Sequence, residues 1–250
     1  MDSGYYAACS ALKAHTSALE IAANNIANLS TTGYRGQIPS FESLLVQTAG
    51  VRQNAVRQSS PWDRMSNELA ALNGARADLG QGNLEHTGNP LDFAVEGPGF
   101  FAVQTKGGTL YTRNGSFRVS ANGQLQTSAG DPVLGASGPI TVPRGQLSIS
   151  PDGTISVSGA VTGKLRIVEF APSAEVSPAG ASYYSVPAAA AKPALESLVR
   201  QGMLESSNVS PVAAMVGLIS AQRQAEMVER AMSEYYSDFN RIAVEDLPKV

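Results

Sequence analysis

The sequence predicts an α+β protein whose N- and C-terminal helices pair as an antiparallel coiled coil, with a small all-β domain inserted between them. Apolar residues recur at steps of three and four positions near both ends of the 250-residue chain. Between the ends, short alternating segments are separated by turns that contain Gly, Asn or Asp. The 24 glycines and 14 prolines exceed the share usual in soluble proteins, which fits a turn-rich middle.

The first predicted helix begins near the N-terminus and reaches Leu29. Its seam-compatible residues have the spacing of the a and d positions of a coiled coil. They are Tyr5, Ala8, Leu12, His15, Leu19, Ala22, Ile26 and Leu29. Of these, we expect Leu12, Leu19, Ile26 and Leu29 to lie in a subunit interface.

The second predicted helix follows Pro211, a residue that suits the first turn of a helix. Its seam has the same spacing, at Leu218, Ala221, Ala225, Val228, Met232, Tyr235, Phe239 and Ile242. We expect the six larger residues, Leu218, Val228, Met232, Tyr235, Phe239 and Ile242, to be interface residues. Each helix alone could simply pack on its own domain. Two matched seams favour ends that pair with each other and with neighbouring copies.

The first helix runs into an asparagine-rich stretch. Asn24, Asn25 and Asn28, here called the junction asparagines, oppose helix formation, and their amides can bond the backbone or a neighbouring chain. We therefore expect them to make contacts at the junction between subunits. Gly33 suits the left-handed conformation that ends a helix, so we expect it to be the terminator.

The region after this junction carries weak signals. Residues 37–80 are interpreted as an extended or partly helical connector, in which Trp62 and Met65 anchor the chain on a neighbour or, alternatively, Trp62 is buried in a solvated loop. The expected organisation is a discontinuous helical core of residues 1–36 and 205–250, this connector, and a β-rich outer domain of residues 81–204.

Strand signals dominate from residue 88 onward. Segments 91–95 and 100–103 predict strands, and Lys106-Gly107-Gly108 predicts a hairpin turn. Segments 117–125 and 147–155 each predict a hairpin, because Asn122-Gly123 and Asp152-Gly153 tolerate the positive φ of tight turns. Residues 161–170 predict a further strand, and residues 172–193 predict a loop.

Composition argues against several kinds of chemistry. A net charge of −3 does not suggest binding to nucleic acid, and no apolar run is long enough to insert in a membrane. Two His and one Cys make a metal centre improbable, and no cofactor is expected. The G-x-G-x-x-A pattern at 97–102 continues as strand, unlike a dinucleotide-binding turn. The remaining candidates for hydrolysis are two carboxylate pairs, Asp92 with Glu96 and Asp131 with Asp152. We expect no enzyme.

Several blocks of the sequence resemble the rod and hook family of bacterial flagellar axial proteins. The first is Ala22–Arg35, reading AANNIANLSTTGYR. The second begins with Gly88–Phe101, reading GNPLDFAVEGPGFF, and continues at 111–117 and 122–125. The third is Leu204–Ser210, reading LESSNVS, together with the helix that follows. Length, the opening Met1-Asp2 and the single β insertion are most similar to the proximal-rod type, and the distal-rod type comes next.

The resemblance implies a structural subunit of the basal-body rod that crosses the periplasm. The terminal helices would form an inner coiled-coil tube around the export channel, with the β domain outside it. Its partners would be copies of itself, other rod and hook subunits, and the flagellar type III export apparatus. Asp2 and Lys13 do not fit a secretory signal, which is compatible with a cytoplasmic protein or with export by a signal-free route. The resemblance implies export without cleavage. The alternatives are a self-contained secreted β-domain that binds a ligand such as carbohydrate, and a carboxylate-dependent hydrolase.

Overall fold

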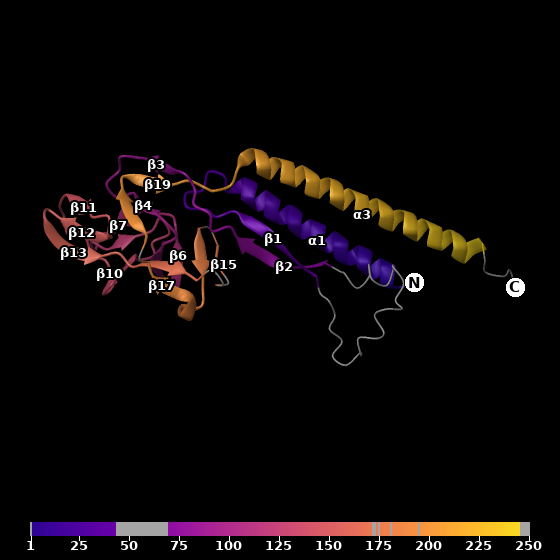
Figure 1. The fold of residues 1–250 in the computed structure, drawn as a ribbon, viewed down its shortest axis with the longest axis horizontal. Helices are drawn as coiled ribbons and strands as arrows, with labels where there is room; N and C mark the ends of the chain where they lie inside the picture. Colours follow the sequence, from indigo (N-terminus) through magenta and orange to yellow (C-terminus); the bar gives the residue numbers. More distant parts are fainter. Residues whose placement is uncertain are drawn as a thin grey trace. The chain divides into compact units, whose positions relative to one another are not determined.

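The computed structural model describes residues 2–43, 70–171, 174, 176–180, 182–194 and 196–245 (Figure 1). The chain divides into two compact units. One contains residues 1–24, 38–75 and 212–250, and the other contains residues 25–37 and 76–211. The second, β-rich unit therefore includes the segments on both sides of the β-rich middle. The division into a helical core of residues 1–36 and 205–250, a connector and an outer domain stays a prediction.

Two long helices lie near the chain ends, as predicted. Helix α1 spans Asp2–Ala27 and helix α3 spans Pro211–Glu245, so α3 begins at the expected proline. Gly33 does not terminate α1, because the helix ends at Ala27 and turns occupy residues 28–33. Short-range bonds such as Thr31 N–H to the Asn28 carbonyl replace the helical pattern there. The Asn-rich sequence explains the early end, since Asn side chains compete for backbone groups.

The two ends of the predicted connector are extended. Strands β1 (Gln37–Ser43) and β2 (Ala70–Ala77) form a two-stranded sheet. Trp62 and Met65 lie outside the described residues, so the role expected for them stays a prediction.

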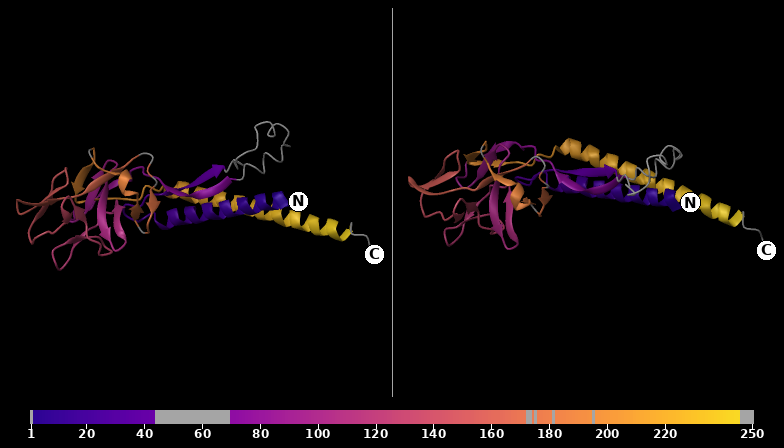
Figure 2. Two further views of the ribbon diagram at one scale, coloured as in Figure 1. Left: turned by 90° about the horizontal axis from the view of Figure 1, so that it is seen from below. Right: turned by 60° about the horizontal axis from the view of Figure 1, so that its bottom comes forward.

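The β-rich unit is built from short antiparallel strands, seen from two further directions in Figure 2. A six-stranded sheet has the order β15–β16–β6–β5–β14–β17, and a three-stranded sheet has the order β11–β12–β13. The other strands pair as β3 with β19, β4 with β18, β7 with β8 and β9 with β10. The bounds are β3 Leu84–His86, β4 Phe93–Glu96, β5 Phe100–Thr105, β6 Gly108–Thr112, β7 Arg118–Val119, β8 Leu125–Gln126, β9 Leu134–Gly135, β10 Gly138–Pro139, β11 Leu147–Ile149, β12 Thr154–Val157, β13 Ala160–Lys164, β14 Ile167–Phe170, β15 Ser177–Pro178, β16 Tyr183–Ser185, β17 Ala191–Pro193, β18 Leu198–Gln201 and β19 Met203–Glu205, with a 3₁₀ turn η2 at Ala188–Ala190.

The predicted hairpins are confirmed. Strands β5 and β6 pair so that Thr105 faces Gly108, which leaves a two-residue turn. Gly123 between β7 and β8 has φ of 78°, and Gly153 between β11 and β12 has φ of 83°. Both glycines donate their N–H to the residue three positions earlier, which closes each turn.

Strand β5 divides the core into two clusters. Phe101 and Val103 face one cluster with Phe117, whereas Phe100 and Ala102 face another with Tyr184. This alternation explains why residues 100–103 of β5 are all apolar, because both faces of the strand are buried over these four positions.

The loop predicted for residues 172–193 is wrong in part. Strand β16 pairs with β6, and β17 pairs with β14, so both extend the six-stranded sheet. Tyr184 of β16 is 2% exposed and belongs to the core. The strands are too short and too rich in Ala, Ser and Pro for a local signal, and it is pairing with β6 and β14 that makes them strands.

Candidate functional site

Asn25, a junction asparagine, uses both side-chain polar atoms within its own chain. Its Oδ1 accepts hydrogen bonds from the Tyr34 hydroxyl at 3.1 Å and from the Gln37 N–H at 2.8 Å, and its Nδ2 donates to the Gln37 carbonyl at 2.8 Å. The Asn28 Oδ1 accepts from the Thr31 hydroxyl at 3.1 Å. Asn25 therefore ties the segment that follows α1 back to the helix end. Contacts of the junction asparagines with another subunit stay a prediction.

Gly33 lies where two chain segments touch. It has φ of 67°, and its N–H donates a 2.7 Å hydrogen bond to the Glu205 carbonyl oxygen. A Cβ at this position would lie 2.3 Å from the Asn114 nitrogen and 2.8 Å from the Arg113 oxygen. Glycine is required here by close approach as well as by conformation.

Three charged side chains, Arg35, Arg113 and Glu205, form a buried group that we call the ion triad. The Glu205 Oε1 lies 2.8 Å from the Arg35 Nη1, and its Oε2 lies 2.9 Å from the Arg113 Nη1. All three side chains are 1% exposed. Because one carboxylate faces two guanidinium groups, the triad places a net positive charge in the interior.

Arg113 is positioned by the β-rich unit itself. Its Nη1 donates to the Val95 carbonyl at 3.1 Å, and its Nη2 donates to the Gly97 carbonyl. Its guanidinium carbon lies 4.7 Å from the centre of the Phe100 ring, within the range of a cation–π interaction. Burial lowers the pKa of Arg113 to about 10, while Glu205 favours the charged form. The side chain is thus positively charged at neutral pH.

Arg35 enters from the segment that follows α1. Its backbone N–H donates to the Tyr184 hydroxyl at 2.8 Å, and its Nη1 also donates to the Gly80 carbonyl. Burial lowers the pKa of Arg35 and raises the pKa of Tyr184 to about 12. Among the described residues, Nε and Nη2 of Arg35 and Nε of Arg113 have no hydrogen-bond partner.

Asn208 holds the same segments together beside the triad. Its Oδ1 accepts from the Gly36 N–H at 2.7 Å, and its Nδ2 donates to the carbonyls of Asp78 at 3.1 Å and Gly80 at 2.9 Å. Residues that precede the β-rich middle and residues that follow it are therefore bonded to each other directly.

No sequence pattern singled out the ion triad, although each member lies in one of the quoted blocks. Arg35 ends the first block, Arg113 lies in the continuation of the second, and Glu205 stands near the start of the third. The first and third blocks each contain one charged residue, but the second also contains Asp92 and Glu96, so the sequence did not mark Arg113. The convergence of the three triad members could not be seen, because they are far apart in the sequence.

The predicted seam of α3 coincides with the side of the helix that is least exposed. Ala221 is 9% and Ala225 is 6% exposed, whereas Arg223 and Gln224 between them are exposed. The other interface candidates with described side chains in the two seams, namely Leu12, Leu19, Ile26, Leu29, Leu218, Val228 and Met232, are partly buried. The side chains of Tyr235, Phe239 and Ile242 lie outside the described part.

Among the described side chains of α1, the two buried positions are Ala14 at 5% and Ile21 at 9% exposed. They lie one residue before the seam positions His15 and Ala22. Ala14 and Ile21 are seven residues apart, which is the spacing expected for a coiled-coil seam. The buried side of α1 is therefore shifted by one position toward the N-terminus relative to the predicted seam.

The first carboxylate pair considered for hydrolysis serves local structure. Asp92 is 6% exposed and accepts hydrogen bonds from the Thr87 hydroxyl at 2.7 Å and the Asn89 amide at 3.0 Å. Glu96 forms an ion pair with Arg200 at 2.8 Å on the surface. Each carboxylate therefore has its own structural partners.

The second pair is also engaged elsewhere. Asp131 accepts a hydrogen bond from the Tyr183 hydroxyl at 2.9 Å, and Asp152 lies 3.2 Å from the Lys164 Nζ. In the part of the chain that the structure describes, no group of three or more His, Cys, Asp or Glu could hold a metal ion. No helix among the described residues is long and apolar enough to span a membrane.

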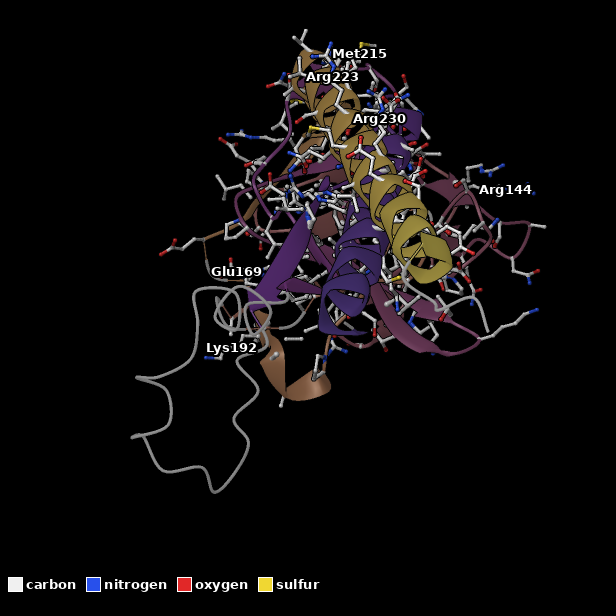
Figure 3. All side chains as sticks on the ribbon, turned by 90° about the vertical axis from the view of Figure 1, so that its right-hand side faces the viewer. Arg144, Glu169, Lys192, Met215, Arg223 and Arg230 are labelled. Atoms are coloured by element: carbon white, nitrogen blue, oxygen red, sulfur yellow. The ribbon has the colours of Figure 1, made fainter. Side chains whose placement is uncertain are left out.

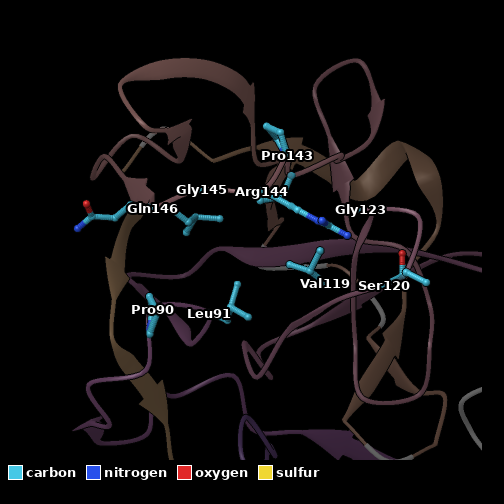
Figure 4. Close-up of a pocket in the computed structure, with 12 residues that line it drawn as sticks. Pro90, Leu91, Val119, Ser120, Gly123, Pro143, Arg144, Gly145 and Gln146 are labelled. Atoms are coloured by element: carbon cyan, nitrogen blue, oxygen red, sulfur yellow. The ribbon is translucent and has the colours of Figure 1, made fainter.

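A hollow of about 580 Å³ lies in the β-rich unit between β7 and residues 142–147 (Figure 4). Leu91 and Val119 give it an apolar side, and Arg144 extends toward Gly123. The described residues that line it include no His, Cys, Asp or Glu, so it offers no acid, base or thiol nucleophile from these types.

Three family models match the chain in order. A flagellar basal-body rod protein model matches residues 6–35, a model of the flagellar hook protein FlgE/F/G D1 domain matches residues 94–157, and a model of the flagellar basal-body rod FlgEFG protein C-terminal region matches residues 200–237. Each match contains one member of the ion triad. These matches place the chain in the class of flagellar axial proteins.

Curated relatives define the family more closely. The chain is 34% identical to the basal-body rod protein FlgF of Caulobacter vibrioides over the full length of both, and 34% identical to FlgF of Escherichia coli over 93% of the chain and 94% of that protein. FlgG of Agrobacterium fabrum is also 34% identical, over 90% of the chain and 92% of that protein. The chain belongs to the family of flagellar basal-body rod proteins, with FlgF-type members among its relatives. The expectation of a structural protein of this family, rather than an enzyme, is confirmed.

Proposed function

We propose that this rod-family subunit polymerises helically into the drive shaft of the flagellum. In this proposal α1 and α3 pair as an antiparallel coiled coil and line the export channel, while the β-rich region lies outside that tube. Torque then passes through many distributed contacts between subunits, which are heterologous because the assembly is helical. The proposed organisation is a helical core of residues 1–36 and 205–250, a connector of residues 37–80 and an outer domain of residues 81–204.

The observation that carries this proposal is the burial of α3 along the predicted seam. Ala221 and Ala225 are small and buried, which allows another helix to approach closely. Connectivity supports the antiparallel direction. Short segments join the end of α1 to Arg35 and join Glu205 to the start of α3, and these two residues are in contact. Helices that leave from one point and pair must run in opposite directions along the chain.

A second apolar face of α3 supports contacts beyond one hairpin. Val212, Met215, Val216 and Ile219 are between 52% and 73% exposed. Figure 3 labels Met215 projecting from α3, together with the charged Arg223 and Arg230 farther along the helix. An isolated chain leaves this surface in water, so association with neighbouring rod or hook subunits would stabilise it.

We further propose that the junction asparagines contribute contacts between subunits, and that the flagellar type III apparatus exports the chain without cleavage. The partners in this proposal are other copies, other rod and hook subunits and the export apparatus.

The test compares Ala225→Glu with Gln224→Glu in a strain that lacks the native protein. The two variants place the same charge one residue apart, inside and outside the proposed seam. Burial of an unpaired carboxylate costs several kcal/mol, so Ala225→Glu should reduce the protein recovered in isolated basal bodies and impair swimming. Gln224→Glu should assemble normally.

Equal incorporation of both variants would contradict the coiled-coil seam. Absence of the unmodified protein from isolated basal bodies would contradict the rod assignment itself. Urea unfolding of the purified variants, monitored by a spectroscopic signal of the β-rich unit, shows whether either variant has lost its fold in general.

A further inference from the structure

The ion triad is asymmetric in charge. Glu205 and Arg113 alone make a neutral pair, and Arg35 adds the surplus positive charge. Loss of Glu205 leaves two buried guanidinium groups that repel each other, whereas loss of Arg35 leaves a neutral pair. Removing one partner of a buried ion pair is costly because it strands the other charge.

The two members of the neutral pair are held by the β-rich unit without help from the N-terminal segment. Glu205 ends β19, where it stands opposite Leu84 in the ladder with β3. Arg113 donates to the carbonyls of Val95 and Gly97. These contacts come from residues 84–113 and 203–205.

The N-terminal segment, residues 25–37, bonds to Asp78, Gly80, Ser182 and Tyr184. Three further attachments join it to the C-terminal segment, residues 205–208. Gly33 donates to the Glu205 carbonyl at 2.7 Å, and Arg35 pairs with the Glu205 carboxylate at 2.8 Å. Gly36 donates to the Asn208 side chain at 2.7 Å. Gly33, Arg35 and Gly36 are all buried. Because a buried N–H group or charge is unfavourable without a partner, each of these contacts requires its partner to be in place.

From this geometry we infer that Glu205 controls the docking of the N-terminal segment onto the rest of the β-rich unit, residues 76–211. The energetic coupling between the two segments is reciprocal. The two segments differ in how well each is held without the other. When Arg35 is absent, the C-terminal strand β19 still pairs with β3, and Glu205 still pairs with Arg113. The N-terminal segment without Glu205 would bring a second cation next to Arg113. It therefore docks only onto a unit that already holds the C-terminal strand.

This dependence sets an order of events. Synthesis runs from the N-terminus, so residues 25–37 exist long before Glu205 does. They remain undocked until β19 has formed, and the chain segments that lead to α1 and α3 are then fixed to the β-rich unit in the same step. The inference concerns this unit alone and does not rest on the proposed polymerisation.

The test is hydrogen–deuterium exchange on the full chain carrying Glu205→Gln or Arg35→Met. In Glu205→Gln, the amides of Gly33 and Gly36 should exchange faster by on the order of 100-fold. In Arg35→Met the same two amides should exchange faster. The amides of Thr87 and Ser206, which bond the Gly202 and Asn83 carbonyls, should there stay within about threefold of the unmodified protein.

Two results would overturn the inference. One is unchanged protection of Gly33 and Gly36 in Glu205→Gln. The other is an Arg35→Met variant in which Thr87 and Ser206 open as much as Gly33, since the C-terminal strand would then depend on the N-terminal segment. The second comparison decides the matter even if Glu205→Gln does not fold.

A double variant gives an independent check. When Glu205→Gln is already present, adding Arg35→Met removes one of the two stranded cations. The added change should then lower the urea midpoint by less than it does in the unmodified protein, or should raise it. Equal shifts in the two backgrounds would show that the side chains are not coupled and would overturn the inference.

Discussion

The Asn208 side-chain oxygen accepts a 2.7 Å hydrogen bond from the Gly36 N–H, across a separation of 172 residues. The Asn208 amide nitrogen donates to the carbonyls of Asp78 and Gly80. A single side chain thus serves three backbone groups from two segments. Asn208→Ala should lower the stability of the β-rich unit by about 2–3 kcal/mol, because the buried Gly36 N–H loses its acceptor. Urea unfolding measures this loss.

An exposed polar residue supplies the control for this change. Ser137→Ala removes a hydroxyl group from a surface turn and should change stability by less than about 0.5 kcal/mol. Similar unfolding curves for the Asn208 and Ser137 variants would show that Asn208 does not bridge the two segments in solution.

Gly33→Ala should destabilise the protein for two reasons, an unfavourable backbone conformation and a steric clash. The same change at Gly130 measures the conformational cost alone. Gly33 has φ of 67° and no room for a Cβ, while Gly130 has φ of 92° and nothing within 4 Å of the place that a Cβ would take. Gly130→Ala should therefore cost about 1–2 kcal/mol for conformation alone. Gly33→Ala should cost at least about 3 kcal/mol, because the Arg113–Asn114 backbone must also move. Thermal or urea unfolding of both variants tests the difference, and equal losses would contradict the close approach.

Local sequence signals were sufficient for the hairpins and for the central strand. Asn122-Gly123 and Asp152-Gly153 tolerate positive φ, and both turns form where predicted. The run from Phe100 to Val103 is apolar on both faces and forms buried β5. In such cases the structure depends on neighbours in the sequence, so the sequence alone is informative.

Features that depend on distant partners could not be predicted in this way. Tyr184 lies in a segment rich in Ala and Ser, and it is a core residue because β16 pairs with β6. Arg35, Arg113 and Glu205 have no local pattern in common, and the fold alone brings both guanidinium groups against the Glu205 carboxylate. The sequence therefore selected Gly33 as a helix terminator and Asn25 as a subunit contact, and it did not select the charged centre beside them. The subunit contact of Asn25 stays a prediction.

Ile219 tests the exposed apolar face of α3. The side chain is 52% exposed, so Ile219→Asp should change the unfolding free energy of the isolated chain by less than about 0.5 kcal/mol. If neighbouring subunits cover this face, the same change should sharply reduce incorporation into basal bodies. Ser220→Asp, at the next exposed position, is the matched control. Normal incorporation of the Ile219 variant would exclude this face from the contacts of the rod.

The raised pKa of Tyr184 predicts that the folded protein loses stability at alkaline pH. Burial raises its pKa from 10.0 to about 12 in the folded protein. Below pH 10 the contribution of the Tyr184 hydroxyl to stability is fully present. Between pH 10 and pH 12 the unfolded chain loses the hydroxyl proton, while the folded chain keeps it. Stability therefore falls with rising pH in that window, by about 1.4 kcal/mol at pH 11.

Tyr184→Phe should remove this part of the pH dependence. At pH 7 the variant should be less stable by about 1–2 kcal/mol, since the buried Arg35 N–H loses its acceptor. From pH 9 to pH 11 its urea midpoint should fall by less than that of the unmodified protein. Burial also raises the pKa of Tyr34 and Tyr183, but these residues are present in both proteins and cancel in the comparison. An equal fall in the two midpoints would mean that the Tyr184 hydroxyl titrates as it does in water, and that the contact with Arg35 is open in solution.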